Sequence, residues 1–213
     1  MIETHTEKTV LCFGDSNTWG CDPAGGPRFD RNTRWPGILQ QELGEAFHVI
    51  EEGLGGRTTA LDDPLEGSKN GYQHLEPILH SHMPLDLLII MLGTNDLKNR
   101  FGVSAMDVSW GVRRLIKLAH DHADAFTGGV AKILMICPPP FADMSEVVLR
   151  EIFIGGEAKS HQLAAEYKRI CAESDVPFLN AGDIIQSSPT DGIHFDAIEH
   201  AKLGKVIAEL VLG

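Results

Sequence analysis

Five short segments of the chain have the composition of β-strands, and glycine, proline or polar residues flank each of them. The clearest is 85–92, which is apolar almost throughout and shows no alternation. Such runs are typical of strands that are buried on both faces of a parallel sheet. We therefore predict strands at residues 10–13, 47–52, 85–92, 131–137 and 176–179.

Between these strands, apolar residues recur at the spacing of helices that bury one face. The pattern predicts helices at about 35–43, 71–82, 104–123, 157–174 and from 196 to the C-terminal end. Ser104 with Asp107, and Asp196 with Glu199, have the spacing of capping boxes at helix starts. Strands that alternate with helices indicate an α/β fold, here a three-layer α/β/α sandwich around a central parallel sheet of about five strands. We expect one domain over residues 1–213.

Two segments between the predicted elements stand apart. Residues 141–156 are more apolar than an ordinary loop, and they form either a pocket wall or subunit contact, or else a short core helix. The tract 21–33 is rich in glycine, proline and aspartate and is expected to be a loop. Within the helix at 104–123, we expect Trp110 to serve in packing.

The composition excludes several classes of partner. The chain carries 30 acidic and 18 basic side chains, and its net charge of −12 repels nucleic acid and anionic membranes. Residues 1–8 are polar, and no apolar run approaches the length of a membrane span. We therefore expect a cytoplasmic protein that binds neither nucleic acid nor membranes.

Neither the cysteines nor the histidines have the spacing of a metal site. The four cysteines, at positions 12, 21, 137 and 171, form no Cys-x-x-Cys pair, and two of them fall in apolar strands. His74, His80 and His82 are expected on a solvated helix face. We expect no metal, no cofactor and no disulfide framework.

The strand at 10–13 runs directly into Gly14, Asp15 and Ser16, where the glycine permits a sharp turn. In an open parallel sheet, ligands bind at the carboxyl ends of the strands. Ser16 therefore either offers its hydroxyl to a substrate at that edge or caps the helix that follows.

Three further polar blocks follow in order, at Gly53–Thr58, Gly93–Asp96 and Asp191–His194. Together with Phe13–Asn17, they resemble the motifs of the SGNH (GDSL-like) hydrolases, and the likeness spans nearly the whole chain. More narrowly, the chain resembles the small bacterial arylesterase and acyl-transferring branch of that family. Asn17 stands where the family name has leucine, beside the expected nucleophile. The resemblance implies a flavodoxin-like sandwich and a serine nucleophile.

The residue types in these blocks suit nucleophilic catalysis by a serine. A serine hydroxyl is a poor nucleophile until a neighbouring base takes its proton. His194 is the candidate base, and Asp191, three residues earlier, can hold its other ring nitrogen. We therefore predict a catalytic triad of Ser16, His194 and Asp191.

Acyl transfer also needs hydrogen-bond donors for the oxygen that becomes negative in the tetrahedral intermediate. The resemblance assigns this oxyanion hole to the backbone N–H groups of Ser16 and Gly56 and to the side-chain amide of Asn95. Gly55 is an alternative to Gly56. For Asn95 the alternative is a turn or a helix cap.

The other polar and aromatic residues near these blocks receive supporting roles. We assign Trp19 and Asn17, which follow Ser16 closely, to substrate binding. Trp35 is expected to join Trp19 in the wall of a small acyl pocket. Asp15 and Asp96 are expected to hold loops in place.

These observations predict a metal-independent serine ester hydrolase whose partner is a small-molecule ester. The resemblance implies short acyl chains on aromatic or simple alcohols, competition of an alcohol or peroxide with water for the acyl-enzyme, and a homo-oligomer. The same machinery serves carbohydrate O-acetylesterases and thioesterases, which are alternatives. A non-catalytic α/β ligand-binding domain is the alternative from another class. A dinucleotide-binding domain is poorly supported, because no Gly-x-Gly-x-x-Gly follows the first strand.

Overall fold

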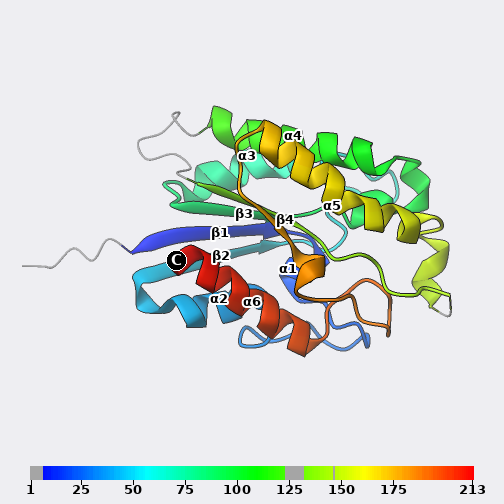
Figure 1. Cartoon of the computed structure of the whole chain (residues 1–213), viewed down its shortest axis with the longest axis horizontal. Helices are drawn as coiled ribbons and strands as arrows, with labels where there is room; N and C mark the ends of the chain where they lie inside the picture. Colours follow the sequence, from blue (N-terminus) through cyan, green and yellow to red (C-terminus); the bar gives the residue numbers. More distant parts are fainter. Residues whose placement is uncertain (1–6, 123–131, 146) are drawn as a thin grey trace, which may run out of the picture.

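Five parallel strands form the central sheet, in the order β2-β1-β3-β4-β5. The computed structural model describes residues 7–122, 132–145 and 147–213 (Figure 1). The strands are β1 (Lys8–Gly14), β2 (Phe47–Gly53), β3 (Leu87–Met91), β4 (Ile133–Cys137) and β5 (Phe178–Asn180). All five predicted strands are confirmed, although the first predicted residue of β4, Ala131, lies outside the described residues.

Helices cover both faces of this sheet, as the alternating pattern predicts. They are α1 (Ser16–Trp19), α2 (Trp35–Leu43), α3 (Gly71–His82), α4 (Ala105–Asp121), α5 (Gly156–Glu173) and α6 (Ala197–Leu212). Short 3₁₀ turns are η1 (Gly44–Ala46), η2 (Asn95–Leu97), η3 (Asn99–Phe101), η4 (Val148–Glu151) and η5 (Ala181–Asp183). In Figure 1, α2 and α6 lie on one side of the sheet, and α3, α4 and α5 lie on the other. The three-layer α/β/α sandwich is confirmed.

Strand β1 shows how the sequence divides the interior into two cores. Leu11 and Phe13 pack into the core beneath α3, α4 and α5, whereas Val10 and Cys12 pack into the core beneath α2 and α6. Successive side chains of a strand point to opposite faces, so a continuous apolar run supplies both cores at once.

The strand order places the end of β1 at a topological switch point. The chain leaves β1 for β2 on one side and later returns to place β3 on the other. In open parallel sheets, ligands bind outside the carboxyl ends of the strands at such a point. Helix α1, which begins at Ser16, starts directly beyond this point.

Three predictions about single side chains need correction. Trp35, the first residue of α2, is completely buried in the core between the sheet, α2 and α6, so it walls no acyl pocket. Trp110 is 52% exposed on α4, so it is not a packing residue. Asp196 is the N-cap residue of α6, but its side chain caps nothing and instead accepts a hydrogen bond from Ser188.

The capping box at the start of α4 is confirmed, because the side chains of Ser104 and Asp107 each accept from the other's backbone N–H. In the described part of 141–156 the helical turn is η4, which buries none of its own residues, so the short core helix is wrong, while a pocket wall or subunit contact stays a prediction. Phe141, Met144 and Phe153 are buried around the short turn η4, whereas Val148 is 91% exposed. Among the described residues, no helix has the length and apolar character needed to cross a membrane.

Candidate active site

The turn after β1 holds Ser16 at the first position of a very short helix. Gly14 has no room for a side chain, since an added Cβ would lie 2.8 Å from the Met91 carbonyl oxygen. Asp15 is the N-cap of α1, and its carboxylate accepts from the Asn17 N–H at 2.9 Å. The alternative in which Ser16 serves as the cap is therefore wrong. Its hydroxyl is left for other contacts.

Ser16, His194 and Asp191 form a continuous hydrogen-bonded relay. The Ser16 Oγ lies 2.9 Å from His194 Nε2, and His194 Nδ1 lies 2.5 Å from Asp191 Oδ2. Serine and histidine are 178 positions apart in the chain. The structure thus brings together the three residues that the motifs single out, in the order nucleophile, base and acid that serine catalysis uses.

The environment of this relay favours the charged form of both ionisable partners. Burial alone would lower the pKa of His194, but the hydrogen bond and charge of Asp191 outweigh it and raise this pKa. Burial would likewise raise the pKa of Asp191, but the hydrogen bond and charge of His194 lower it below its ordinary range. Asp191 is therefore ionised and can stabilise a positive charge on the His194 ring.

The turn that carries His194 is fixed by several backbone hydrogen bonds. Asp191 Oδ1 accepts from the N–H groups of Ile193 and His194, each at 2.9 Å. The Asn17 side-chain amide lies 3.4 Å from the Ile193 carbonyl oxygen, and Asn17 is almost completely buried. Asn17 therefore lies between the Ser16 turn and the His194 turn rather than on an open surface.

Two of the predicted oxyanion-hole donors follow β2 and β3, the strands on either side of β1. Gly56, after β2, has a φ of +81°, and an added Cβ there would lie 2.5 Å from Glu66 Oε2. Gly55 has open space at the same position. Within the described part of the chain, the Gly56 N–H donates no hydrogen bond. Asn95, after β3, is buried and donates from its amide to the Arg57 carbonyl oxygen at 3.1 Å.

Arg57 is an important residue that the sequence analysis did not single out. Its guanidinium is buried, lies 4.1 Å from the Phe13 ring centroid, and donates to the carbonyl oxygens of Gly14 and Glu52 at the ends of β1 and β2. Burial lowers its pKa to about 10, so it remains charged at neutral pH. No local pattern marks this role, because Arg57 meets the ends of β1 and β2 only in the folded sheet.

Two buried carboxyl groups hold the loops beneath the site, as predicted. Asp96 accepts from the backbone N–H of Thr59 at 2.9 Å and from its hydroxyl at 2.5 Å. Asp15 caps α1 and lies 3.5 Å from the Asn95 amide. Burial raises the pKa of each carboxyl group to about 6.

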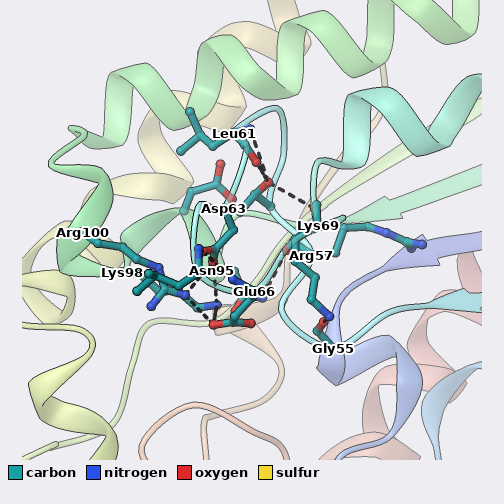
Figure 2. Close-up of polar contacts among 12 residues, drawn as sticks. Gly55, Arg57, Leu61, Asp63, Glu66, Lys69, Asn95, Lys98 and Arg100 are labelled. Atoms are coloured by element: carbon teal, nitrogen blue, oxygen red, sulfur yellow. Dashed lines mark hydrogen bonds and ion pairs between the residues drawn. The ribbon is translucent and has the colours of Figure 1, made fainter.

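A cluster of four charged side chains lies next to Gly56, and we call it the ion cluster: Asp63, Glu66, Lys98 and Arg100. Lys98 lies 2.6 Å from Glu66 and 3.6 Å from Asp63, and Arg100 contacts both carboxylates (Figure 2). Burial opposes the charge of Asp63, but Arg100 and neighbouring N–H groups lower its pKa to about 2. Glu66, on the same loop, is the side chain that faces Gly56.

Two further residues lie close to the triad. Trp19 ends α1 and is half-buried, with the Arg28 guanidinium 4.9 Å from its ring centroid. Cys21, two residues past the end of α1, lies near enough to the His194 ring to add to the rise in its pKa. The cysteine count alone gave no indication of this contact.

Comparison with known proteins identifies the family. The GDSL-like Lipase/Acylhydrolase family matches residues 12–201, which include the Ser16, Gly56, Asn95 and Asp191–His194 positions. The chain belongs to this family. This GDSL-like protein is therefore a carboxylic ester hydrolase of the SGNH type. No curated protein matches it.

Solved structures of two relatives show how close the likeness is. The aryl esterase of M. smegmatis is 42% identical, with a TM-score of 0.90, and the match covers 96% of this chain and 98% of that one. Est24, a carbohydrate acetylesterase from Sinorhizobium meliloti, is 41% identical, with a TM-score of 0.92 and the same coverage of both chains. An inhibitor-bound form of the M. smegmatis enzyme matches at a TM-score of 0.91. The family and the fold predicted from the motifs are confirmed.

Proposed function

We propose that this GDSL-like hydrolase cleaves short-chain acyl esters through an acyl-enzyme on Ser16. The observation that carries the proposal is the relay from Ser16 Oγ through His194 to Asp191, with distances of 2.9 and 2.5 Å. Both contacts lie within hydrogen-bonding range, which is the geometry that general-base activation of a hydroxyl requires.

In this mechanism His194 Nε2 takes the hydroxyl proton while Ser16 Oγ attacks the ester carbonyl carbon. The tetrahedral intermediate collapses when the same nitrogen gives the proton to the leaving alcohol oxygen. Water then repeats the sequence on the acyl-enzyme and releases the acid. Asp191 fixes the ring of His194 and stabilises its charge in both halves of the reaction.

The negative oxygen of the intermediate is held by the backbone N–H groups of Ser16 and Gly56 and by the Asn95 amide. Support for Gly56 over Gly55 comes from its φ of +81°, which only glycine adopts readily and which fixes the direction of its N–H. The second amide hydrogen of Asn95 faces only a long 3.5 Å contact to Asp15, so it is free to bind the oxyanion.

For the substrate, we propose acetyl and other short acyl esters of aromatic or simple alcohols, after the M. smegmatis aryl esterase. Acetylated carbohydrates are the second candidate, since Est24 is almost equally similar at 41% identity. Alcohols or peroxide are expected to compete with water for the acyl group. Trp19 is proposed as a substrate contact because it is half-exposed at the end of α1, whereas buried Asn17 is proposed to position the His194 turn.

A fluorophosphonate reagent tests the nucleophile directly. We expect one covalent adduct on Ser16, located by peptide mass spectrometry, and loss of aryl acetate hydrolysis in parallel with labelling. Ser16→Ala should abolish both, while Ser81→Ala on the exposed part of α3 should retain both. Aryl acetate hydrolysis by Ser16→Ala at the wild-type rate would contradict the proposal. Rates on aryl acetates, acetylated sugars and acyl thioesters then rank the substrate classes.

We also propose a homo-oligomer, as the family resemblance implied. The support is an exposed apolar group beside η4, where Val148, Ile152 and Ile154 lie at the surface. Light scattering coupled to size-exclusion chromatography measures the mass in solution, and a mass of one chain would contradict this proposal.

A further inference from the structure

Three side chains of the kind that bind transition metals meet away from the catalytic relay. Glu76 and His80 lie on α3, and His122 is the C-cap residue of α4. One ligand atom from each lies within 4.8 Å of the others. His80 Nε2 is 3.1 Å from His122 Nδ1, and His122 Nε2 is 3.6 Å from Glu76 Oε1.

We propose that Glu76, His80 and His122 form a binding site for a divalent transition metal, with zinc as the best fit. Two Zn–N bonds of about 2.0–2.1 Å that diverge at a tetrahedral angle end about 3.3 Å apart. The two facing imidazole nitrogens are 3.1 Å apart, so both can reach one ion without moving their backbones. Water completes the coordination on the solvent side.

The third ligand is positioned by helix geometry. Glu76 and His80 are four residues apart on α3, so their side chains share one face of the helix. The Glu76 side chain is about half exposed and contacts His122 Nε2, so it binds the same ion by turning toward the two facing nitrogens. A carboxylate beside two imidazoles also supplies the negative charge that a divalent cation favours.

The local electrostatics support a cation at this place. His80 lies in the last turn of α3, and His122 directly follows the last residue of α4. Both helices therefore direct their negative dipole ends toward the cluster. Two imidazoles and one carboxylate favour Zn²⁺ and neighbouring ions such as Co²⁺ or Ni²⁺, whereas Mg²⁺ and Ca²⁺ prefer sites made only of oxygen.

The location indicates a structural rather than a catalytic ion. α3 and α4 run back from the carboxyl edge of the sheet, where Ser16 lies, and both end toward its amino edge (Figure 1). A metal here joins the ends of two helices that are 42 positions apart at His80 and His122. It stabilises the folded chain by mass action and leaves the ester chemistry unchanged.

Zinc binding to the full chain tests this proposal. Isothermal titration calorimetry with Zn²⁺ should detect one site that His80→Asn or His122→Asn weakens by at least about tenfold. The matched control is His120→Asn, at the same helix end but about 200° around the helix from His122, which should bind zinc like the wild type. At a free zinc concentration of about 100 times Kd, the Tm of the wild type should rise by about 5–10 °C.

Anomalous scattering at the zinc edge locates the ion in crystals, and a peak between His80 and His122 supports the site. Co²⁺ added to the wild type should give the visible absorption of low-symmetry coordination, which provides evidence independent of any variant. The proposal is overturned if no zinc binds, or if zinc binds equally to the wild type and to both histidine variants. Hydrolysis by the zinc-free wild type is measured alongside and should match that of the loaded protein.

Discussion

The catalytic relay and the ion cluster are two polar groups of similar size on loops of the same protein, and they are built differently. In the ion cluster each charged group faces opposite charges, and the Asp63 side chain is completely buried. The relay is a single line of hydrogen bonds that ends in the Ser16 hydroxyl, and His194 and Asp191 keep 14% of their side-chain surface exposed. Paired charges such as those of the ion cluster hold loops in one conformation. The relay instead ends in the Ser16 hydroxyl, which can give up a proton to His194.

The pKa shifts of the two groups also differ: the pKa of Asp63 is lowered, and the pKa of His194 is raised. The pKa of Asp63 falls to about 2, so this carboxylate is ionised at neutral and mildly acidic pH. The hydrogen bond and charge of Asp191 raise the pKa of His194. Because its ring lies between Ser16 Oγ and Asp191, we propose that His194 is the group whose charge changes during turnover. Substitutions in the two regions should therefore separate turnover from stability.

Among substitutions that keep the Ser16 hydroxyl, the largest effect on turnover is expected for Asp191→Asn, which removes the charge but keeps the shape. Turnover should fall by about 10⁴-fold at neutral pH, because an amide favours the wrong tautomer of His194. In the wild type, kcat/KM should rise with pH through an apparent pKa above the ordinary histidine value of about 6.5, because only the neutral ring acts as base. In the variant this limb should move to lower pH, and an unmoved limb would contradict the role of Asp191.

A smaller loss is expected for Asn95→Ala, which removes one oxyanion donor. Steady-state kinetics on an aryl acetate should give a kcat lower by about 10²–10³-fold with little change in KM. Asn70→Ala is the matched control, because Asn70 caps α3 through its side chain. It should lower the free energy of unfolding by about 1 kcal/mol and leave kcat close to the wild type. Equal losses of kcat in both variants would remove Asn95 from the oxyanion hole.

Gly56→Ala tests the border between the two regions, since Gly56 lies against Glu66 of the ion cluster. Its left-handed φ costs an alanine about 1–2 kcal/mol, and the new Cβ displaces Glu66. We expect this strain to tilt the N–H away from the oxyanion, so that kcat falls by about tenfold. Gly55→Ala is the neighbouring control, and it should behave like the wild type because its Cβ meets open space. The reverse order would assign the donor to Gly55.

The smallest effect on turnover is expected for Lys98→Met inside the ion cluster. Removal of one partner leaves Asp63 and Glu66 with Arg100 alone, so the free energy of unfolding should fall by about 3 kcal/mol in denaturant titrations. Lys117→Met breaks an exposed pair with Asp121 and should cost less than about 1 kcal/mol. A loss of kcat from Lys98→Met as large as that from Asn95→Ala would mean that the ion cluster takes part in catalysis.

Much of this protein follows from local sequence. The five strands, the five longer helices and the capping box at Ser104 are all predicted from apolar spacing and turn residues. Ser16, Asp191 and His194 stand in short motifs whose residue types fit one chemistry. Local backbone preferences and side-chain periodicity act over a few residues, so the sequence records them directly.

The tertiary structure decided the contacts that join distant segments. It buried Trp35 in a core, exposed Trp110, and placed the Arg57 guanidinium at the ends of β1 and β2. It also brought His122 of α4 to His80 of α3, although the spacing of the histidines within α3 indicates no metal site. These contacts depend on which strands are neighbours and on how the helices pack. Many residues share the same local sequence pattern, so only the packed structure decides which distant residues meet.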